Sequence, residues 1–161
     1  MSPGHGGRAR PGDRERGMIH PSRVLSIGVE RPLDMVARFL ADPRNFPRWA
    51  SGLAGGLTPE REPGEAGAEP GRWAVETPQG RVTLRFSPPN AFGVADHWVH
   101  LPDASVVYVP LRAVANGDGT EVSLTLFRQL GMDAARFEAD ADWVRRDLAA
   151  LKRVLEDEGG L

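Results

Sequence analysis

The sequence contains no cysteine, a single lysine among its 20 basic residues and a single tyrosine. The lack of cysteine excludes disulfide bonds, a thiolate nucleophile and cysteine-ligated zinc, and it is compatible with a reducing cytoplasm. Long apolar runs are also missing, so we expect neither a membrane span, which needs about 20 apolar residues, nor a secretory signal peptide. The net charge of −2 and the scattered arginines give no nucleic-acid signature. We therefore expect a soluble, cytoplasmic protein without a nucleic-acid partner.

The chain is long enough to bury one sizeable core, with 161 residues of which 40% are apolar. Residues 1–22 combine Gly, Pro and Arg with little apolar content, so they are predicted to form a disordered N-terminal tail. Met18 is an alternative first residue of the protein. The folded domain is expected to cover residues 23–158, and residues 159–161 are expected to form a C-terminal tail.

The most regular pattern is that of residues 132–157, which predict one long amphipathic helix. Apolar side chains recur there at steps of three and four, which places them on one face of a helix. They are Phe137, Ala141, Val144, Leu148, Leu151 and Leu155. This face must be buried, and a curved antiparallel sheet formed by the preceding strands is its predicted partner. Such an arrangement can enclose a cavity.

The N-terminal half of the domain is predicted to contain one strand and two short helices. Residues 23–29 show partial alternation, which is typical of a strand. Pro32 suits the first turn of a helix over residues 32–41, and Asp42 is a good N-cap for a second short helix. Residues 53–58 predict a weak strand, followed by a Gly- and Pro-rich loop.

Five further strands are predicted between residues 72 and 129, each bounded by turn-forming residues. They cover residues 73–77, 81–87, 94–101, 105–115 and 121–129. We interpret Asn116-Gly117 as the centre of a type I′ turn between the last two strands, because both positions require positive φ.

This order of elements and three motifs resemble a known superfamily. The motifs are ADPRNFPRWA after the first strand, FGVADHWV entering the fifth, and VPLRAVANGDGTEVSLTLFRQLGM before DLAALKRVLE. Over residues 23–157 the chain resembles a bacterial branch of the START-like (SRPBCC) superfamily of polyketide cyclase/dehydrase-like proteins. The resemblance implies an α+β helix-grip fold, with a curved antiparallel sheet of about seven strands around a long C-terminal helix and two short helices after the first strand. It also implies a hydrophobic cavity for small molecules or lipids, but no single activity.

The segment from Asp96 to His100 carries the richest chemistry. Because neighbouring side chains of a strand point to opposite faces, Asp96, Trp98 and His100 are expected on one face, and His97 and Val99 on the other. The two histidines could not then share a metal ion, so we predict no metal site, and no cofactor is indicated. Asp96 and His97 are candidate catalytic acid/base groups in a dry cavity. The alternative is that both make ordinary structural hydrogen bonds.

Aromatic and arginine side chains are the expected ligand-binding residues, because aromatic walls suit flat apolar ligands and a guanidinium can hold a carboxylate. The candidates are Trp49, Trp73, Phe86, Trp98, Tyr108, Arg112, Phe127, Arg128 and Phe137. Each has a structural alternative. The aromatics can be plain core, and Arg128 can bridge to Asp140 or Asp147 of the C-terminal helix. Which strand face lines the cavity stays open.

The pattern as a whole favours the binding of a small hydrophobic or amphipathic molecule in an internal cavity. One alternative is a cyclase- or dehydratase-type enzyme, in which Asp96 or His97 moves a proton while Tyr108 or Arg112 polarises a carbonyl. A second alternative is a protein-partner-binding module, which requires an exposed apolar patch in place of a cavity. Oligomeric state is not indicated.

Overall fold

The computed structural model describes residues 19–53, 55–61 and 64–157. The expectations for residues 1–18 and for the last few residues therefore lie outside the described part of the chain. In chain order the elements are β1 (Ser22–Val29), α1 (Leu33–Ala41), η1 (Pro43–Arg48), η2 (Ser51–Leu53), β2 (Thr58–Pro59), β3 (Arg72–Thr77), β4 (Gly80–Phe86), β5 (His97–His100), β6 (Val106–Val109), β7 (Leu111–Asn116), β8 (Gly119–Phe127) and α2 (Ala134–Asp157).

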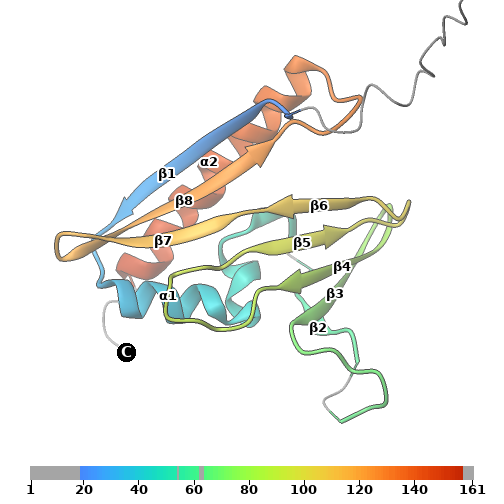
Figure 1. The fold of residues 1–161 in the computed structure, drawn as a ribbon, viewed down its shortest axis with the longest axis horizontal. Helices are drawn as coiled ribbons and strands as arrows, with labels where there is room; N and C mark the ends of the chain where they lie inside the picture. The colour runs from blue at the N-terminus through green and yellow to red at the C-terminus, as the bar shows by residue number, and fades with distance from the viewer. Residues whose placement is uncertain (1–18, 54, 62–63, 158–161) are drawn as a thin grey trace, which may run out of the picture.

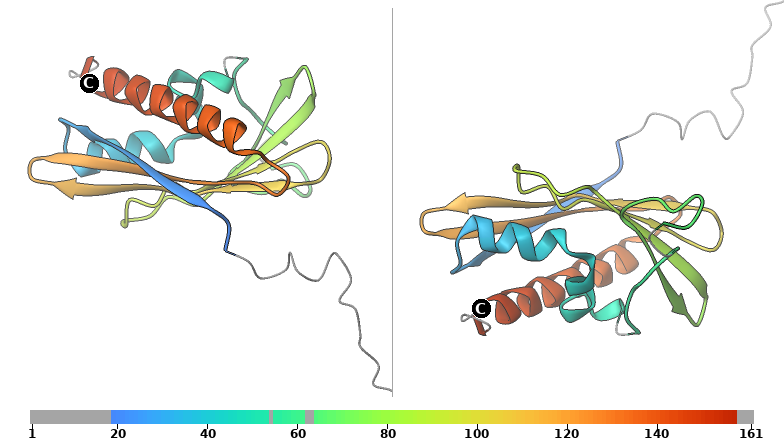
Figure 2. Two further views of the ribbon diagram at one scale, coloured as in Figure 1. Left: turned by 90° about the horizontal axis from the view of Figure 1, so that it is seen from above. Right: turned by 90° about the horizontal axis from the view of Figure 1, so that it is seen from below.

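The architecture is an α+β helix-grip, as predicted. A curved antiparallel sheet wraps around α2, and α1 lies on the same side of the sheet as α2 (Figures 1 and 2). The short 3-10 segments η1 and η2 lie between α1 and the loop that leads to β2. They correspond to the second short helix of the sequence prediction, and Asp42 caps η1 by accepting a hydrogen bond from the Arg44 amide, 3.0 Å away.

The apolar stripe of α2 faces the sheet, which confirms the helical pattern read from the sequence. Five of its six predicted members are buried: Phe137, Ala141, Leu148, Leu151 and Leu155. Val144 is partly buried and packs against the same core. The core of the domain therefore lies between this face of α2 and the concave face of the sheet.

The sheet consists of two hydrogen-bonded ladders, β1-β8-β7 and β2-β3-β4-β5-β6. They are joined where residues just before β5 pair with β7. The Ala113 amide donates to the Gly93 carbonyl at 2.8 Å, and the Ala95 amide donates to the Leu111 carbonyl at 2.9 Å. This junction makes one continuous curved surface from the two ladders (Figure 1).

The prediction of a single strand over residues 105–115 is wrong in one respect. The strand is interrupted at Pro110, which separates β6 from β7. Proline has no amide hydrogen to donate to a neighbouring strand, and its φ is fixed. The Pro110 carbonyl still accepts a hydrogen bond from the Thr125 amide of β8 at 3.0 Å. The division lets β6 pair with β5 while β7 pairs with β8.

The predicted centre of the last hairpin is displaced by one residue. Asn116 pairs with Gly119, so the two central residues are Gly117 and Asp118. Only Gly117 of these two has positive φ, at 57°. Positive φ at the first central position alone is the pattern of a II′ turn, whereas the sequence had suggested the I′ type.

Candidate functional site

A cavity of about 260 Å³ lies between the concave face of the sheet, the 3-10 segments and α2. Its walls come from η1, η2, β4, β5, β6, β8 and α2. The lining residues are Phe46, Trp49, Ala50, Gly52, Leu53, Val82, Leu84, His97, Val99, Val109, Leu124, Leu126, Trp143, Val144, Asp147 and Leu148. A mostly apolar lining with a few polar groups is typical of small-molecule sites.

His97 is the buried polar group of this lining, with 4% of its surface exposed. It shares one face of β5 with Val99, as the sequence predicted, and the structure places this face on the concave side. The imidazole packs edge-on against Phe46, with ring centroids 4.9 Å apart, and against Phe86 at 5.8 Å. These contacts hold the ring in place on the cavity wall.

Burial lowers the pKa of His97 to about 4, because an imidazolium in an apolar wall loses its hydration. The Ala95 carbonyl, 3.5 Å from Nδ1, opposes this shift only weakly. His97 is therefore a neutral imidazole at physiological pH.

This lowered pKa predicts that acid destabilises the protein through His97. In the unfolded chain the histidine binds a proton near pH 6.5, while in the folded chain it does so only near pH 4. Its contribution to stability is thus complete above about pH 6.5 and is lost as the pH falls toward 4. We expect the free energy of unfolding to fall by about 2 kcal/mol from this source between about pH 7.5 and pH 5.

The measurement is urea unfolding of wild type and His97→Leu at both pH values. The leucine variant should lose about 2 kcal/mol less on acidification, whatever its stability at the higher pH. Titrating carboxylates elsewhere affect both proteins equally, so the difference isolates His97. Equal losses in the two proteins would contradict a neutral, desolvated imidazole.

The cavity reaches the surface beside Trp143 of α2, which is 46% exposed. Here Asp147 accepts hydrogen bonds from the Ser51 amide at 3.2 Å and the Ser51 hydroxyl at 2.7 Å. The indole Nε1 of Trp143 donates to the same hydroxyl at 2.8 Å. These bonds fix η2 to α2 at the cavity mouth, and they place the Asp147 carboxylate at its rim.

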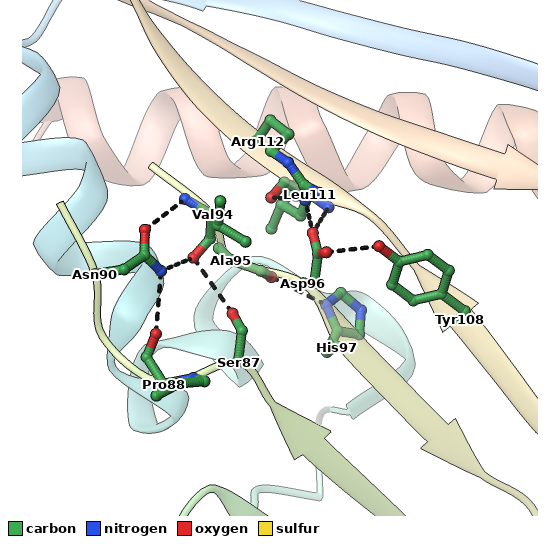
Figure 3. A network of polar contacts seen from close by, with 10 residues as sticks. All are labelled: Ser87, Pro88, Asn90, Val94, Ala95, Asp96, His97, Tyr108, Leu111 and Arg112. Atoms are coloured by element: carbon green, nitrogen blue, oxygen red, sulfur yellow. Dashed lines mark hydrogen bonds and ion pairs between the residues drawn. The ribbon is translucent and has the colours of Figure 1, made fainter. Parts of the chain in front are cut away.

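Asp96 lies on the other face of β5 and belongs to a separate polar network (Figure 3). Its carboxylate accepts hydrogen bonds from the Tyr108 hydroxyl at 2.7 Å and the Leu111 amide at 3.0 Å, and it forms an ion pair with Arg112. This network spans the β6-β7 division at Pro110. The carboxylate therefore holds the bend in the sheet and has no place in the cavity lining.

The outer face of the sheet also carries a row of stacked side chains. Arg85 lies over the Trp98 ring at 4.0 Å, Trp98 stacks on Tyr108 at 5.1 Å, and Tyr108 stacks on Phe127 at 6.4 Å. These rings were expected to be ligand-binding residues. The structure places them on the convex side, away from the cavity.

The remaining expected binding residues are dispersed. Trp49 lines the cavity, whereas Phe86 packs behind His97. Trp73 borders a surface hollow with Pro43. Arg128 donates from Nε to the Met132 carbonyl at 2.7 Å and does not line the cavity.

Phe137 is buried on α2 beneath the guanidinium of Arg23, whose centre is 5.4 Å from the ring centroid. It therefore belongs to the end of the core between α2 and β1. It does not line the cavity.

Most residues that sequence reasoning missed are aliphatic. Val82 and Leu84 of β4, and Leu124 and Leu126 of β8, line the cavity. The two residues of each pair are two positions apart on their strand, so strand alternation could have indicated from the sequence that they share a face. Ser51 and Asp147 are 96 residues apart in sequence and gave no local signal.

No group of three or more metal-ligating side chains is placed to hold an ion within the described residues. Among the same residues, no helix is both long and apolar enough to cross a membrane.

Comparison with known proteins relates the chain to solved structures. No protein-family model matches the chain, and no curated protein does. A START superfamily protein from Mycobacterium smegmatis shares 9% identity over 84% of this chain and 97% of its own, with a TM-score of 0.62. The chain has the START-like helix-grip fold. The protein Ara h 8.0201 has a TM-score of 0.56 at 10% identity, over 86% of this chain and 99% of its own.

Two longer proteins share the same fold over part of their length. The di-domain ARO/CYC BexL of the BE-7585A biosynthetic pathway has 21% identity and a TM-score of 0.63, over 84% of this chain and 46% of its own. DynU16, a putative protein in the dynemicin biosynthetic locus, has 18% identity and a TM-score of 0.57, over 84% and 47%. This chain spans about half the length of either.

Proposed function

We propose that the protein binds a small, mainly apolar molecule in the cavity between the sheet and α2. The observation that carries this proposal is the cavity of about 260 Å³ between the sheet and α2, whose lining is almost entirely apolar. A purely structural core of this size has few voids larger than a water molecule. An apolar cavity kept open by the fold is a site that an apolar guest can fill.

A cyclase- or dehydratase-type enzyme is the second candidate, and His97 is the observation that favours it. A neutral imidazole in a dry cavity can accept a proton from a bound molecule. The other groups proposed for such a reaction, Asp96, Tyr108 and Arg112, are engaged with one another on the opposite face. Binding without turnover is therefore the better supported proposal. A partner-binding module would have been favoured by a filled core.

The binding proposal can be tested by a substitution on β5 that fills the cavity with a larger side chain. Val99 lines it, and Val99→Trp should place an indole in the space that a ligand would occupy. Val114 of β7 is 52% exposed, so Val114→Trp is the matched control. With the uncharged fluorescent probe N-phenyl-1-naphthylamine, we expect wild type and the control to bind alike, and Val99→Trp to bind about tenfold more weakly or worse.

Thermal melts establish that each variant is folded, and Leu126→Phe on β8 serves as a second cavity-filling change. Undiminished probe binding by both folded, filled variants would place the probe elsewhere and reject the proposal. Molecules retained by the purified chain are identified by mass spectrometry and incubated with wild type and His97→Gln. A rate of conversion that falls about a hundredfold in the variant would establish the enzyme in place of the carrier.

A further inference from the structure

The one histidine in the cavity wall has an unused hydrogen-bonding atom. The Nδ1 atom of His97 lies 3.5 Å from the Ala95 carbonyl, and no other hydrogen bond of this ring occurs within the described residues. A carbonyl oxygen can only accept, so this contact favours the tautomer of the neutral imidazole that carries its proton on Nδ1. Nε2 is then an acceptor with a free lone pair.

The ring of His97 lies in the wall of the cavity. Nδ1 is the nitrogen nearer the backbone and points to the strand's own carbonyl, while Nε2 is at the far edge of the ring. The packing of Phe46 and Phe86 against the ring restrains its orientation, and the side chain lines the cavity. Nε2 has no hydrogen-bond partner within the described residues, so a guest that supplies a donor gains a bond that a guest without a donor cannot make.

The cavity wall has no positively charged side chain that could pair with an anionic guest. The lining contains no arginine or lysine, and its one carboxylate, that of Asp147, lies at the rim and would repel an anion. Burying an uncompensated charge in an apolar wall is strongly unfavourable. The cavity wall thus disfavours anions, and the imidazole acceptor of His97 favours molecules with a hydrogen-bond donor.

We infer that His97 is the specificity-determining residue of this cavity and that it accepts, through Nε2, a hydrogen bond from a hydroxyl or N–H group of an uncharged, otherwise apolar ligand. This inference rests on the proposed binding function and adds the chemical class of the ligand. A cavity of about 150 Å³ holds one benzene ring. The present cavity of about 260 Å³ suits a guest of two fused rings.

The experiment compares four naphthyl probes on the full chain at neutral pH, by displacement of N-phenyl-1-naphthylamine. The probes are 2-naphthol, which donates, 2-methoxynaphthalene, which only accepts, naphthalene, which does neither, and 2-naphthoate, which is an anion. We expect 2-naphthol to bind about tenfold more tightly than naphthalene or 2-methoxynaphthalene, the size of one net hydrogen bond. The anion should bind most weakly of the four.

Variants at His97 assign this preference to the residue. His97→Phe should keep naphthalene binding and lose the preference for 2-naphthol, while His97→Gln, whose amide oxygen accepts, should restore most of it. A merely structural histidine would alter all four affinities together. The ratio between 2-naphthol and naphthalene is therefore the decisive readout.

Three results would overturn the inference while leaving the binding function intact: equal binding of naphthalene and 2-naphthol, equal binding of 2-methoxynaphthalene and 2-naphthol, or an unchanged preference in His97→Phe. Failure of the dye and all four probes to bind wild type would reject the binding function itself, and the inference with it. The two failures are thus told apart by whether naphthalene and the dye enter the cavity.

Discussion

Asp96→Ala is expected to lower the free energy of unfolding by about 3 to 5 kcal/mol. The substitution leaves the Leu111 amide without an acceptor in a place that is almost fully buried, and it removes the acceptor of the Tyr108 hydroxyl. The ion pair with Arg112 adds less, because that guanidinium is 39% exposed and is screened by solvent. Denaturant unfolding of the variant measures the loss.

Two further variants separate the network from a general effect of losing a carboxylate. Asp96→Asn keeps an oxygen for the Leu111 amide, so it should lose about half as much stability. Asp103 accepts hydrogen bonds from the Ser105 amide and hydroxyl in an exposed turn, and Asp103→Ala should cause a much smaller change. If Asp96→Ala were no more destabilising than Asp103→Ala, the proposed role of Asp96 at the bend would be incorrect.

The same network explains why the sequence did not show which face of β5 lines the cavity. Alternation correctly separated Asp96 from His97, but it could not say which of them faces α2. The two faces of β5 both carry polar and aromatic side chains, so hydrophobicity did not distinguish inside from outside. The choice is made by Pro110 and the β6-β7 bend, where the Leu111 amide requires an acceptor on the convex side.

The fold could be predicted from the sequence far more completely than the site, because the strongest signals of the fold are local in sequence. The stripe from Phe137 to Leu155 repeats with the period of a helix, and tertiary packing then only has to bury one face. The strands were bounded by Pro, Gly and Asn, which act through their own φ angles. The register of the last hairpin was misplaced by one residue, because both Asn116-Gly117 and Gly117-Asp118 satisfy the rules for tight turns.

Contacts between distant segments account for what the sequence did not reveal. Ser51 and Asp147 meet at the cavity mouth because η2 follows η1 along the side of α2, and neither residue belongs to a recognisable motif. The large aromatics were expected to form the wall. Trp49 does line the cavity, but at the centre of the sheet the wall is formed by aliphatic side chains such as Leu84 and Leu124, and three of the expected aromatics stack on the outer face.

The second large effect is expected at the junction of the two ladders. Gly93 has a φ of 67°, and a Cβ atom there would overlap the carbonyl oxygen of Ala113 and lie 3.0 Å from its carbonyl carbon. Both atoms belong to the backbone of β7, which is fixed by its pairing with β8. Asn90 holds the chain on the other side by accepting from the Phe92 and Val94 amides at 2.9 and 3.2 Å (Figure 3 shows the Val94 bond).

Gly93→Ala should therefore lower the free energy of unfolding by about 2 to 6 kcal/mol, which combines backbone strain of about 1 to 3 with overpacking of about 1 to 3. Gly117 is the matched control, since its φ is 57° but a Cβ there would meet nothing within 4 Å. Gly117→Ala should show the cost of positive φ alone, about 1 kcal/mol. The difference between the two variants in guanidinium unfolding measures the close approach of the strands, and equal losses would mean that the ladders can separate at Gly93 without cost.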